Sequence, residues 1–378
     1  MRSEVVVYTR DVVGRRMAGP GIRAFHLADE IAHKAPVTLV AELAGFEGLG
    51  RFKALQRGTG DALDALRTAR VVIGQPTREL LRLTRRPTRV VFDLFDPVVL
   101  ELPVIYAGRT GIRGRAHQWI EWQRLQRAMR EGDLLVCATP QQFSFYAGVH
   151  LSAGGESDGW REKWLTVPFG VESRDTADDG PVEQLGDEPL VVWGGGSWPW
   201  LDPETALEAV ERLRASGTKV KLLMLGGRRP NEGVAEAATS GWARTMDTNA
   251  SVAVLRNREW IPYRERARWL RACSVAIMLH RESLEAEFAI RTRLFDAIWC
   301  GIPVVATRGG FAAELVEREG LGCVVAPGDV ADVAAAIGRI LGDAAFHASC
   351  VANLERMRER FSWNRVTAPL LERIVPWL

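Results

Sequence analysis

The strongest indication of chemistry in the chain is the stretch from Glu285 to Thr307. Thr292 is a residue type that often caps a helix N-terminus, and the residues after it, up to Cys300, fit about two turns of helix. Gly301 fits a helix C-terminal stop, and Pro303 then opens a β-branched strand. The stretch therefore predicts a short helix whose first backbone N–H groups have no partner inside the helix.

Such a helix N-terminus favours an anion, because its free N–H groups and its dipole both attract negative charge. Arg291 and Arg293 flank it and could hold a diphosphate from two sides. Thr292 and Leu294 share this first turn, and Asp296 could accept a hydrogen bond from a ribose hydroxyl. The alternative is an ordinary helix whose arginines pair with nearby acids.

A glycine-rich loop follows another apolar run, in the sequence Trp193-Gly-Gly-Gly-Ser-Trp-Pro-Trp-Leu-Asp-Pro203. Gly194, Gly195 and Gly196 have no side chain, so the backbone there can approach a ligand closely. The Asp-Pro pair at the end of the loop begins a helix well. The alternative is a tight turn whose tryptophans pack on the domain surface.

A third loop joins the first predicted strand to the first predicted helix. Gly19 and Gly21 permit close backbone approach, and Arg23 could reach a phosphate from the first helical turn. A dehydrogenase would use such a turn as well, and Glu42 near the end of the next strand supports that alternative. Ala24, however, stands where the third glycine of the dinucleotide-binding pattern belongs.

Short apolar runs alternate with amphipathic stretches along the chain, which predicts an α/β fold with doubly wound parallel sheets. In the N-terminal half we expect strands at residues 4–9, 37–41, 70–74, 89–94, 133–138 and 164–167, and helices at 21–33 and 115–131. In the C-terminal half we expect strands at 190–193, 220–225, 274–279, 303–307 and 322–326, and a helix at 204–215.

The composition between Glu172 and Pro189 changes to Asp, Gly, Pro and Glu, which indicates a linker between two domains. We therefore expect an N-terminal domain over residues 1–175 and a C-terminal domain over residues 186–360. Two such domains would form a cleft at the carboxyl ends of their sheets.

Composition narrows the class of protein. A chain of 378 residues, 47% hydrophobic and 25% charged, suits a two-domain globular enzyme, and a net charge of +2 does not indicate a nucleic-acid partner. The five cysteines form no C-x-x-C pair, and no spacing resembles a metal site, so we expect no metal and a reducing, cytoplasmic location. No signal peptide or run of about 18 apolar residues is present.

One segment has a strong local charge excess. From Arg78 to Arg130 there are eleven arginines against five acids, an excess of six positive charges. One interpretation is a solvated arginine-rich surface; the other is a patch for anionic lipid or an anionic acceptor. The second would allow peripheral contact with the inner face of a membrane.

The stretch from Glu285 to Thr307 resembles the carboxylate motif of retaining family-4 glycosyltransferases, in which two spaced acids precede a Gly-x-Pro-Val-Val-Ala strand. The segment Gly301-Ile-Pro-Val-Val-Ala-Thr307 carries the closest match. Asp296 falls where the second acid holds the nucleotide ribose, and Glu285 and Glu287 lie near the first acid, which contacts the donor sugar. The Arg-Thr-Arg and Trp-Gly-Gly-Gly segments resemble a divergent bacterial subgroup.

The resemblance implies the GT-B fold: two Rossmann-like domains, with a terminal segment at 361–378 that crosses back to the N-terminal one. It implies that the C-terminal domain binds the nucleotide-sugar, with further contacts at Gly227 and Ile261, and that the N-terminal domain binds the acceptor. Asp93, at a strand end in the N-terminal domain, could then bind the acceptor hydroxyl; a structural capping role is equally compatible with its position.

These observations together predict a retaining, metal-independent glycosyltransferase without a cofactor. It would move a sugar from a nucleoside diphosphate sugar (NDP-sugar) to a hydroxyl of a glycan, a lipid-linked intermediate or a natural product. Two alternatives remain: a sugar-nucleotide epimerase of the same fold, and a non-catalytic subunit that keeps the nucleotide pocket.

Overall fold

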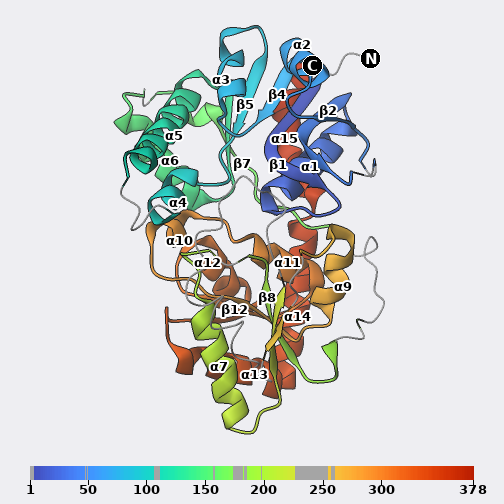
Figure 1. The fold of residues 1–378 in the computed structure, drawn as a ribbon, viewed down its shortest axis with the longest axis vertical. Helices are drawn as coiled ribbons and strands as arrows, with labels where there is room; N and C mark the ends of the chain where they lie inside the picture. Colours follow the sequence, from blue (N-terminus) through green and yellow to red (C-terminus); the bar gives the residue numbers. More distant parts are fainter. Residues whose placement is uncertain are drawn as a thin grey trace. The chain divides into compact units, whose positions relative to one another are not determined.

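The computed structural model describes residues 4–46, 48, 50–105, 111–155, 158–172, 182, 185–196, 198–225, 254–256 and 260–378, with side chains left out at 104, 105, 113, 255 and 256. The chain forms two compact units (Figure 1). The first, here the N-terminal unit, comprises Met1–Gly170, Phe288–Ile290 and Trp363–Leu378. The second, the C-terminal unit, comprises Val171–Glu287 and Arg291–Ser362.

The N-terminal unit contains a parallel sheet of seven strands in the order β3-β2-β1-β4-β5-β6-β7. The chain builds outward from β1 in one direction and then returns to add β4 on its other side, so a topological switch point lies between β1 and β4. The strands are β1 (Val5–Gly14), β2 (Val37–Ala44), β3 (Lys53–Gln56), β4 (Val71–Gly74), β5 (Arg89–Asp93), β6 (Leu134–Cys137) and β7 (Trp164–Thr166).

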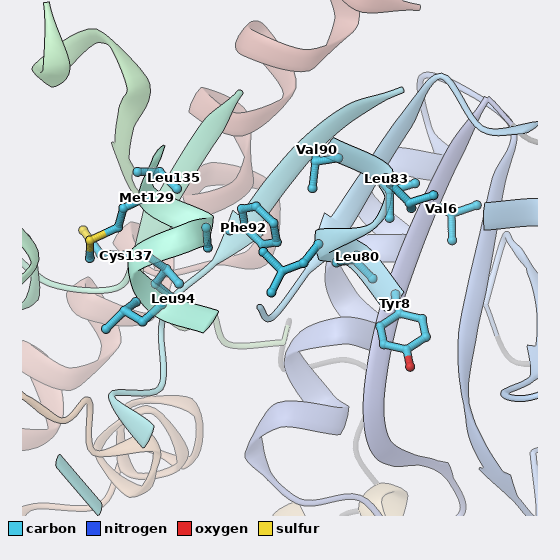
Figure 2. Packing of buried hydrophobic residues seen from close by; sticks show 14 of the residues in the cluster. Val6, Tyr8, Leu80, Leu83, Val90, Phe92, Leu94, Met129, Leu135 and Cys137 are labelled. Carbon is cyan, nitrogen blue, oxygen red and sulfur yellow. The ribbon is translucent and has the colours of Figure 1, made fainter. Parts of the chain in front are cut away.

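Side chains alternate between the two faces of this sheet, as the pleat requires. Val6 and Tyr8 of β1 join a buried cluster with Phe92 and Leu135 of neighbouring strands, and the helices on that face complete it (Figure 2). Helix α1 packs against β1 and against the C-terminal helix α15. The helices of this unit are α1 (Gly19–Ala32), α2 (Gly60–Thr68), α3 (Arg78–Leu81), α4 (Val98–Ile105), α5 (Ile112–Glu131), α6 (Pro140–Ser152) and α15 (Trp363–Ile374).

Helix α15 belongs to the N-terminal unit although it comes last in the chain. Trp363 at its start stacks on His26 of α1, with ring centroids 4.7 Å apart, and packs edge-on against Phe169. A Cβ on Gly170 would lie 2.4 Å from the Trp363 ring, so only glycine permits this approach. These contacts attach the terminal segment to the N-terminal unit.

The C-terminal unit contains a parallel sheet of six strands in the order β10-β9-β8-β11-β12-β13, with its switch point between β8 and β11. The strands are β8 (Leu190–Gly194), β9 (Lys221–Leu225), β10 (Val254–Arg256), β11 (Val275–Met278), β12 (Val304–Thr307) and β13 (Gly322–Val325). The helices that begin in this unit are α7 (Pro203–Ala215), α9 (Arg266–Arg271), α10 (Leu284–Phe288), α11 (Thr292–Cys300), α12 (Gly310–Glu319), α13 (Val330–Gly342) and α14 (Ala344–Arg360).

The predicted α/β class is confirmed, and every strand predicted from an apolar run exists within a few residues of its expected bounds. Two strands escaped prediction, β3 and β10. Both are short strands at a sheet edge, and β3 carries the sequence Lys-Ala-Leu-Gln, which has no β-branched residue. Within the described part of the chain, no helix combines the length and apolar character needed to cross a bilayer.

Candidate functional site

The carboxyl ends of three neighbouring strands of the C-terminal unit carry the residues singled out by the sequence. Gly194 ends β8, His280 follows β11, and Gly309 and Gly310 follow β12. Ligands of open parallel sheets bind at this edge, beside the switch point, because the strands diverge there and leave a crevice. The structure therefore brings the glycine-rich loop and the Glu285–Thr307 stretch to one edge of one sheet.

Helix α11 begins at this edge. Its first residue is Thr292 and its N-cap is Arg291, in extended conformation and without a side-chain capping bond. The prediction that Thr292 is the N-cap is therefore wrong by one residue, because the chain leaves the extended conformation one position earlier. Gly301 ends the helix with a φ of 72°, in the left-handed region, so the predicted glycine stop is confirmed.

Arg293 extends from this helix to the glycine-rich loop. Its Nη2 donates a hydrogen bond to the carbonyl oxygen of Gly196, and its guanidinium carbon lies 4.6 Å from the centre of the Trp193 ring. Gly195, between them, has a φ of 115°, a conformation that favours glycine. The Nη1 of Arg293 is buried and has no hydrogen-bond partner among the described residues. The side chain therefore has one donor available for a further acceptor.

Arg291 has a different arrangement. Its two terminal nitrogens donate to the two oxygens of Glu285, both at 2.7 Å, and Glu285 is 1% exposed. The Nε of Arg291 is buried without a partner among the described residues. Both carboxylate oxygens of Glu285 thus accept a hydrogen bond, so Glu285 holds Arg291 in place. Of the two candidate acids, only Glu287 has an oxygen without a hydrogen-bond partner among the described residues.

Glu287 lies against the glycine pair after β12. Its Oε2 accepts a hydrogen bond from the backbone N–H of Gly310 at 3.3 Å, and a Cβ on Gly309 would lie 2.9 Å from its Oε1. Both glycines have positive φ, 115° and 67°. The sequence analysis missed this pair, although two glycines directly after the end of an apolar strand at Thr307 are themselves a signal of close approach.

His280 stands next to this group. Its backbone N–H donates to Thr307 Oγ1 at 3.2 Å, and its Nδ1 donates to the carbonyl oxygen of Arg281 at 3.2 Å. Burial, and secondly the charge of Arg291, lower the pKa of His280 to about 4. The imidazole is therefore neutral at physiological pH, with its Nδ1 committed and its Nε2 an acceptor.

Three arginines lie close together at α11, and two of them pair with acids. Burial, and then the charges of Arg291 and Arg266, lower the pKa of Arg293 to about 9. Asp296, the predicted ribose ligand, instead accepts a hydrogen bond from Arg266, and burial raises the pKa of its carboxyl group. Arg266 was not predicted, because it lies 30 positions earlier in the chain. An anion would relieve the repulsion among the three arginines.

The remaining predicted nucleotide contacts have mixed outcomes. Ile261 is 8% exposed and follows Trp260, whose ring approaches the position of a Cβ on Gly196 within 3.9 Å. The predicted segment therefore lies beside the glycine-rich loop. Gly227 lies outside the described residues.

The predicted site residues of the N-terminal unit form a structural ion pair. Arg23 is 1% exposed and donates from Nε and Nη2 to the two oxygens of Asp93, at 2.7 and 2.9 Å, and from Nη1 to the carbonyl oxygen of Pro168 at 3.0 Å. Three of the five N–H donors of Arg23 are therefore engaged inside the domain, and the expected phosphate contact of Arg23 stays a prediction. Asp93 accepts two of these bonds, and its expected contact with the acceptor hydroxyl likewise stays a prediction.

The two glycines of the same unit also have structural roles. Gly19 is the first residue of α1, after Ala18 as N-cap. A Cβ on Gly21 would lie 2.3 Å from the carbonyl oxygen of Val12, so glycine permits α1 to lie directly on β1. The missing side chain of Gly21 thus serves helix–strand packing, and its expected approach to a ligand stays a prediction. Glu42, the support for a dehydrogenase, accepts a hydrogen bond from Gln56 at 2.7 Å inside the sheet.

A small pocket lies beside the Arg23–Asp93 pair, at the switch point of the N-terminal sheet. It is lined mainly by apolar side chains from the ends of β1, β4 and β5 and from α1, including Val7, Ala24, Leu27, Ile73 and Phe95. Among the described residues of the whole chain, no group of three or more His, Cys, Asp or Glu could hold a metal ion.

Comparisons with known proteins agree with this geometry. Residues 188–343 match the family model described as glycosyl transferases group 1. No curated protein sequence matches the chain. The matched segment lies in the C-terminal unit and contains the glycine-rich loop, both arginines of α11 and the glycine pair after β12.

Solved structures share the fold over the whole chain. The sucrose-phosphate synthase of Thermosynechococcus elongatus is 17% identical with a TM-score of 0.66, covering 98% of each chain. The HepE protein of Anabaena, in complex with UDP-glucose, is 14% identical with a TM-score of 0.72, covering 98% of this chain and 99% of HepE. The UDP-forming α,α-trehalose-phosphate synthase of Burkholderia xenovorans is 12% identical with a TM-score of 0.65, covering 98% and 99%.

These structures are GT-B glycosyltransferases, and the two parallel-sheet units described above have the same fold. The group 1 domain and the GT-B fold together identify an enzyme of the glycosyltransferase class.

Proposed function

We propose that the protein is a retaining, metal-independent glycosyltransferase, and that the edge of the C-terminal sheet holds the diphosphate of an NDP-sugar. The observation that carries the proposal is Arg293. Its buried Nη1 has no partner among the described residues, at the start of a helix and against a glycine-rich loop. A buried unpaired donor costs about 1–3 kcal/mol, which a bound phosphate oxygen would recover.

The charges around α11 support the same assignment. The pKa of Arg293 falls to about 9 because its side chain is buried and, secondly, because the charges of Arg291 and Arg266 repel its own charge. A diphosphate brings negative charge to this place, where the helix dipole also favours it. When the sugar–phosphate bond breaks, more charge develops on the leaving phosphate, and preorganised arginines stabilise it.

In the proposed reaction the bond between the sugar C1 and the diphosphate oxygen breaks, and a bond from C1 to the acceptor oxygen forms on the same face. The proton of the acceptor hydroxyl passes to the leaving diphosphate, so no metal or protein base is required. Glu287 would bind the donor sugar through its Oε1, which has no hydrogen-bond partner among the described residues and lies against Gly309. Glu285 would orient Arg291.

Other roles follow from the neighbours of this group. Asp296 would hold the ribose while paired with Arg266, and Gly195 and Gly196 would let the loop backbone approach the diphosphate. The solved relatives include proteins with bound UDP-glucose and a UDP-forming synthase, so UDP is the first nucleotide to test. The acceptor would be a glycan, a lipid-linked intermediate or a natural product.

A thermal-shift screen tests the donor site directly. Purified protein is heated with UDP, GDP, TDP or ADP, with and without EDTA, and a ligand that binds only the folded state raises the midpoint. We expect one nucleotide to raise it equally with and without EDTA. An R293M variant should lose the shift, whereas R67M, at an exposed position of α2, should keep it. A shift with NAD alone, or with none of these nucleotides, would contradict the proposal.

The transfer itself is tested with the nucleotide so identified. The NDP-sugar is incubated with an acceptor panel, and the product anomer is assigned by NMR; the same anomeric configuration as the donor is expected, with EDTA present. An epimerase would instead convert the NDP-sugar at C2 without any acceptor. Binding of the nucleotide without turnover of any donor would favour the non-catalytic subunit.

A further inference from the structure

Helix α5 of the N-terminal unit has an outer face that nothing in the described structure covers. Its inner side belongs to the core, where Leu125, Ala128 and Met129 are buried (Figure 2 labels Met129). Its outer side carries Ile112, which is 82% exposed, and Trp119, which is 64% exposed. Large apolar side chains that stay exposed to water forgo the free energy that burial would provide. The face is therefore a candidate for an interaction.

The exposed apolar side chains share one stripe. Ile112, Ala116 and Trp119 are spaced by four and three residues, which places them on the same side of a helix, and Ile120, 39% exposed, lies beside them. Seven large apolar side chains are exposed in the described part of the chain, and three of them belong to this face. The concentration on one helix distinguishes this face from scattered surface residues.

The acidic side chains of α5 are paired with arginines of the same helix. The helix has only two, Glu121 and Glu131. Glu121 is ion-paired with Arg124, and Glu131 accepts a hydrogen bond from Arg127 at 2.9 Å. Both acids therefore have their charge compensated within the helix.

Exposed basic side chains lie along the same helix. Arg115 is four residues before Trp119, and Arg130 lies at the C-terminal end of α5. At the C-terminal end of the helix, Thr84 donates a hydrogen bond to Glu131 at 2.5 Å, which places the segment of exposed Arg82, Arg85 and Arg86 next to it. The charge of Arg85 helps to lower the pKa of Glu131, as expected for a neighbouring cation. The face is thus apolar in the N-terminal half of α5, with Arg115 beside the stripe, and cationic towards its C-terminal end.

We propose that this face of α5 binds the surface of a membrane that contains anionic phospholipid. Trp119 and Ile112 would enter the boundary between headgroups and acyl chains, and the arginines would contact lipid phosphates. A helix that lies in a membrane interface combines exposed aromatic and aliphatic side chains with basic side chains on the same helix. The proposal concerns the N-terminal unit and does not depend on the sugar-nucleotide site.

Charge distinguishes this occupant from a second copy of the chain. In a symmetric dimer through α5, each arginine-rich face would meet its own equivalent, so like charges would oppose each other. An anionic bilayer has the complementary charge at every point of contact. An anionic membrane can therefore contact both the exposed apolar side chains and the arginines of this face.

Vesicle flotation with the full-length protein tests the proposal. The vesicles contain either phosphatidylcholine alone or phosphatidylcholine with phosphatidylglycerol, at low and high salt. We expect binding to the anionic vesicles, weakened by salt, and little binding to the neutral ones. W119E should lower the affinity at least about tenfold, because it replaces an inserted aromatic ring by an acid, and R115Q should lower it about fivefold.

Matched variants exclude a general effect of surface changes. L63E adds an acid at an exposed apolar position of α2 in the same unit, and R67Q removes an exposed arginine there. Both should bind vesicles like the wild type. Brominated lipids that quench tryptophan fluorescence give a second readout. The chain has 13 tryptophans, so W119F should bind but lose part of the quenching.

Three outcomes would overturn the proposal. The first is no preference for anionic vesicles. The second is equal loss of binding in W119E and L63E. The third is a dimer in light scattering that W119E dissociates, without vesicle binding by the wild type, because the face would then be an interface between copies.

Discussion

The two sheets of this protein have the same kind of switch point but different chemistry at it. In the N-terminal unit, Arg23 and Asp93 neutralise each other in a buried pair beside a small apolar pocket. In the C-terminal unit, Arg291 pairs with Glu285 and Arg266 pairs with Asp296, whereas Arg293 forms no ion pair among the described residues. The first arrangement is a closed pair; the second contains one arginine whose charge no described acid compensates.

The glycines at the two switch points differ in the same way. Gly21 permits a helix to touch a strand, since a Cβ there would collide with the backbone of Val12. Around Gly195 a Cβ would meet only the side chain of Arg293, at 3.6 Å, so the loop is open to a ligand. The same residue type thus serves packing in one domain and access in the other.

The largest expected effect is on the free energy of unfolding, when the ion pair between Arg23 and Asp93 is broken. R23M leaves the buried carboxylate of Asp93 unpaired and should lower the free energy of unfolding by about 3–5 kcal/mol. The double variant R23M/D93L removes both charges and should recover much of this loss. Urea unfolding measures both. Nucleotide affinity, measured at a temperature where R23M is folded, should stay unchanged; a large loss of affinity would mean that this pair belongs to the donor site.

His280 provides the next effect, through pH. Its pKa is lowered from 6.5 to about 4, so between these values the unfolded state binds the proton that the folded state does not. Its stabilisation is therefore present above pH 6.5 and is lost as the pH falls towards 4, by about 3 kcal/mol. H280Q should flatten this pH dependence in urea titrations. An unchanged slope would show that His280 is not the group responsible.

Arg293 should matter for turnover rather than for folding. R293M removes a donor that stabilises developing charge and should lower kcat about a hundredfold. Steady-state kinetics with the identified donor measures this loss. Near-wild-type turnover in R293M would remove Arg293 from the diphosphate site.

The smallest expected effects distinguish Gly21, which permits helix–strand packing, from Gly195, which leaves the glycine-rich loop open. G21A should destabilise the fold by about 1–3 kcal/mol, because the added methyl group meets the carbonyl oxygen of Val12 at 2.3 Å, and should leave nucleotide affinity unchanged. G195A should weaken nucleotide binding, since alanine rarely adopts a φ of 115° and the loop must move. If G195A affects only stability, the glycine-rich loop is a structural turn.

Much of the C-terminal site could be predicted from the sequence. Local patterns of apolar residues and helix-capping residues predict three of its elements, and the structure contains all three. They are the strand that ends at Gly194, the helix that ends at Gly301 and the strand after Pro303. The glycine pair Gly309–Gly310 was equally local but was overlooked, since it follows the motif rather than lying inside it.

The N-terminal site was the weaker prediction. A loop with Gly19, Gly21 and Arg23 has the composition of a phosphate-binding turn. Composition does not show that Arg23 has a buried acid within reach, because Asp93 lies 70 positions away and meets it only through the packing of α1 on the sheet. The partner of an arginine at a helix start therefore depends on the folded structure and cannot be read from the composition of its loop.

By itself, the sequence determined the order and type of the helices and strands in this protein. The spacing of apolar residues, the β-branched residues and the glycines that end helices all act over a few residues. Only the tertiary structure decided which charges meet. Arg291 with Glu285, Arg266 with Asp296 and Arg23 with Asp93 are separated by 6, 30 and 70 positions, and each pair forms because folding places the two side chains within hydrogen-bonding distance. Ion pairing depends on distance in space and on burial, and neither is encoded by residue type alone.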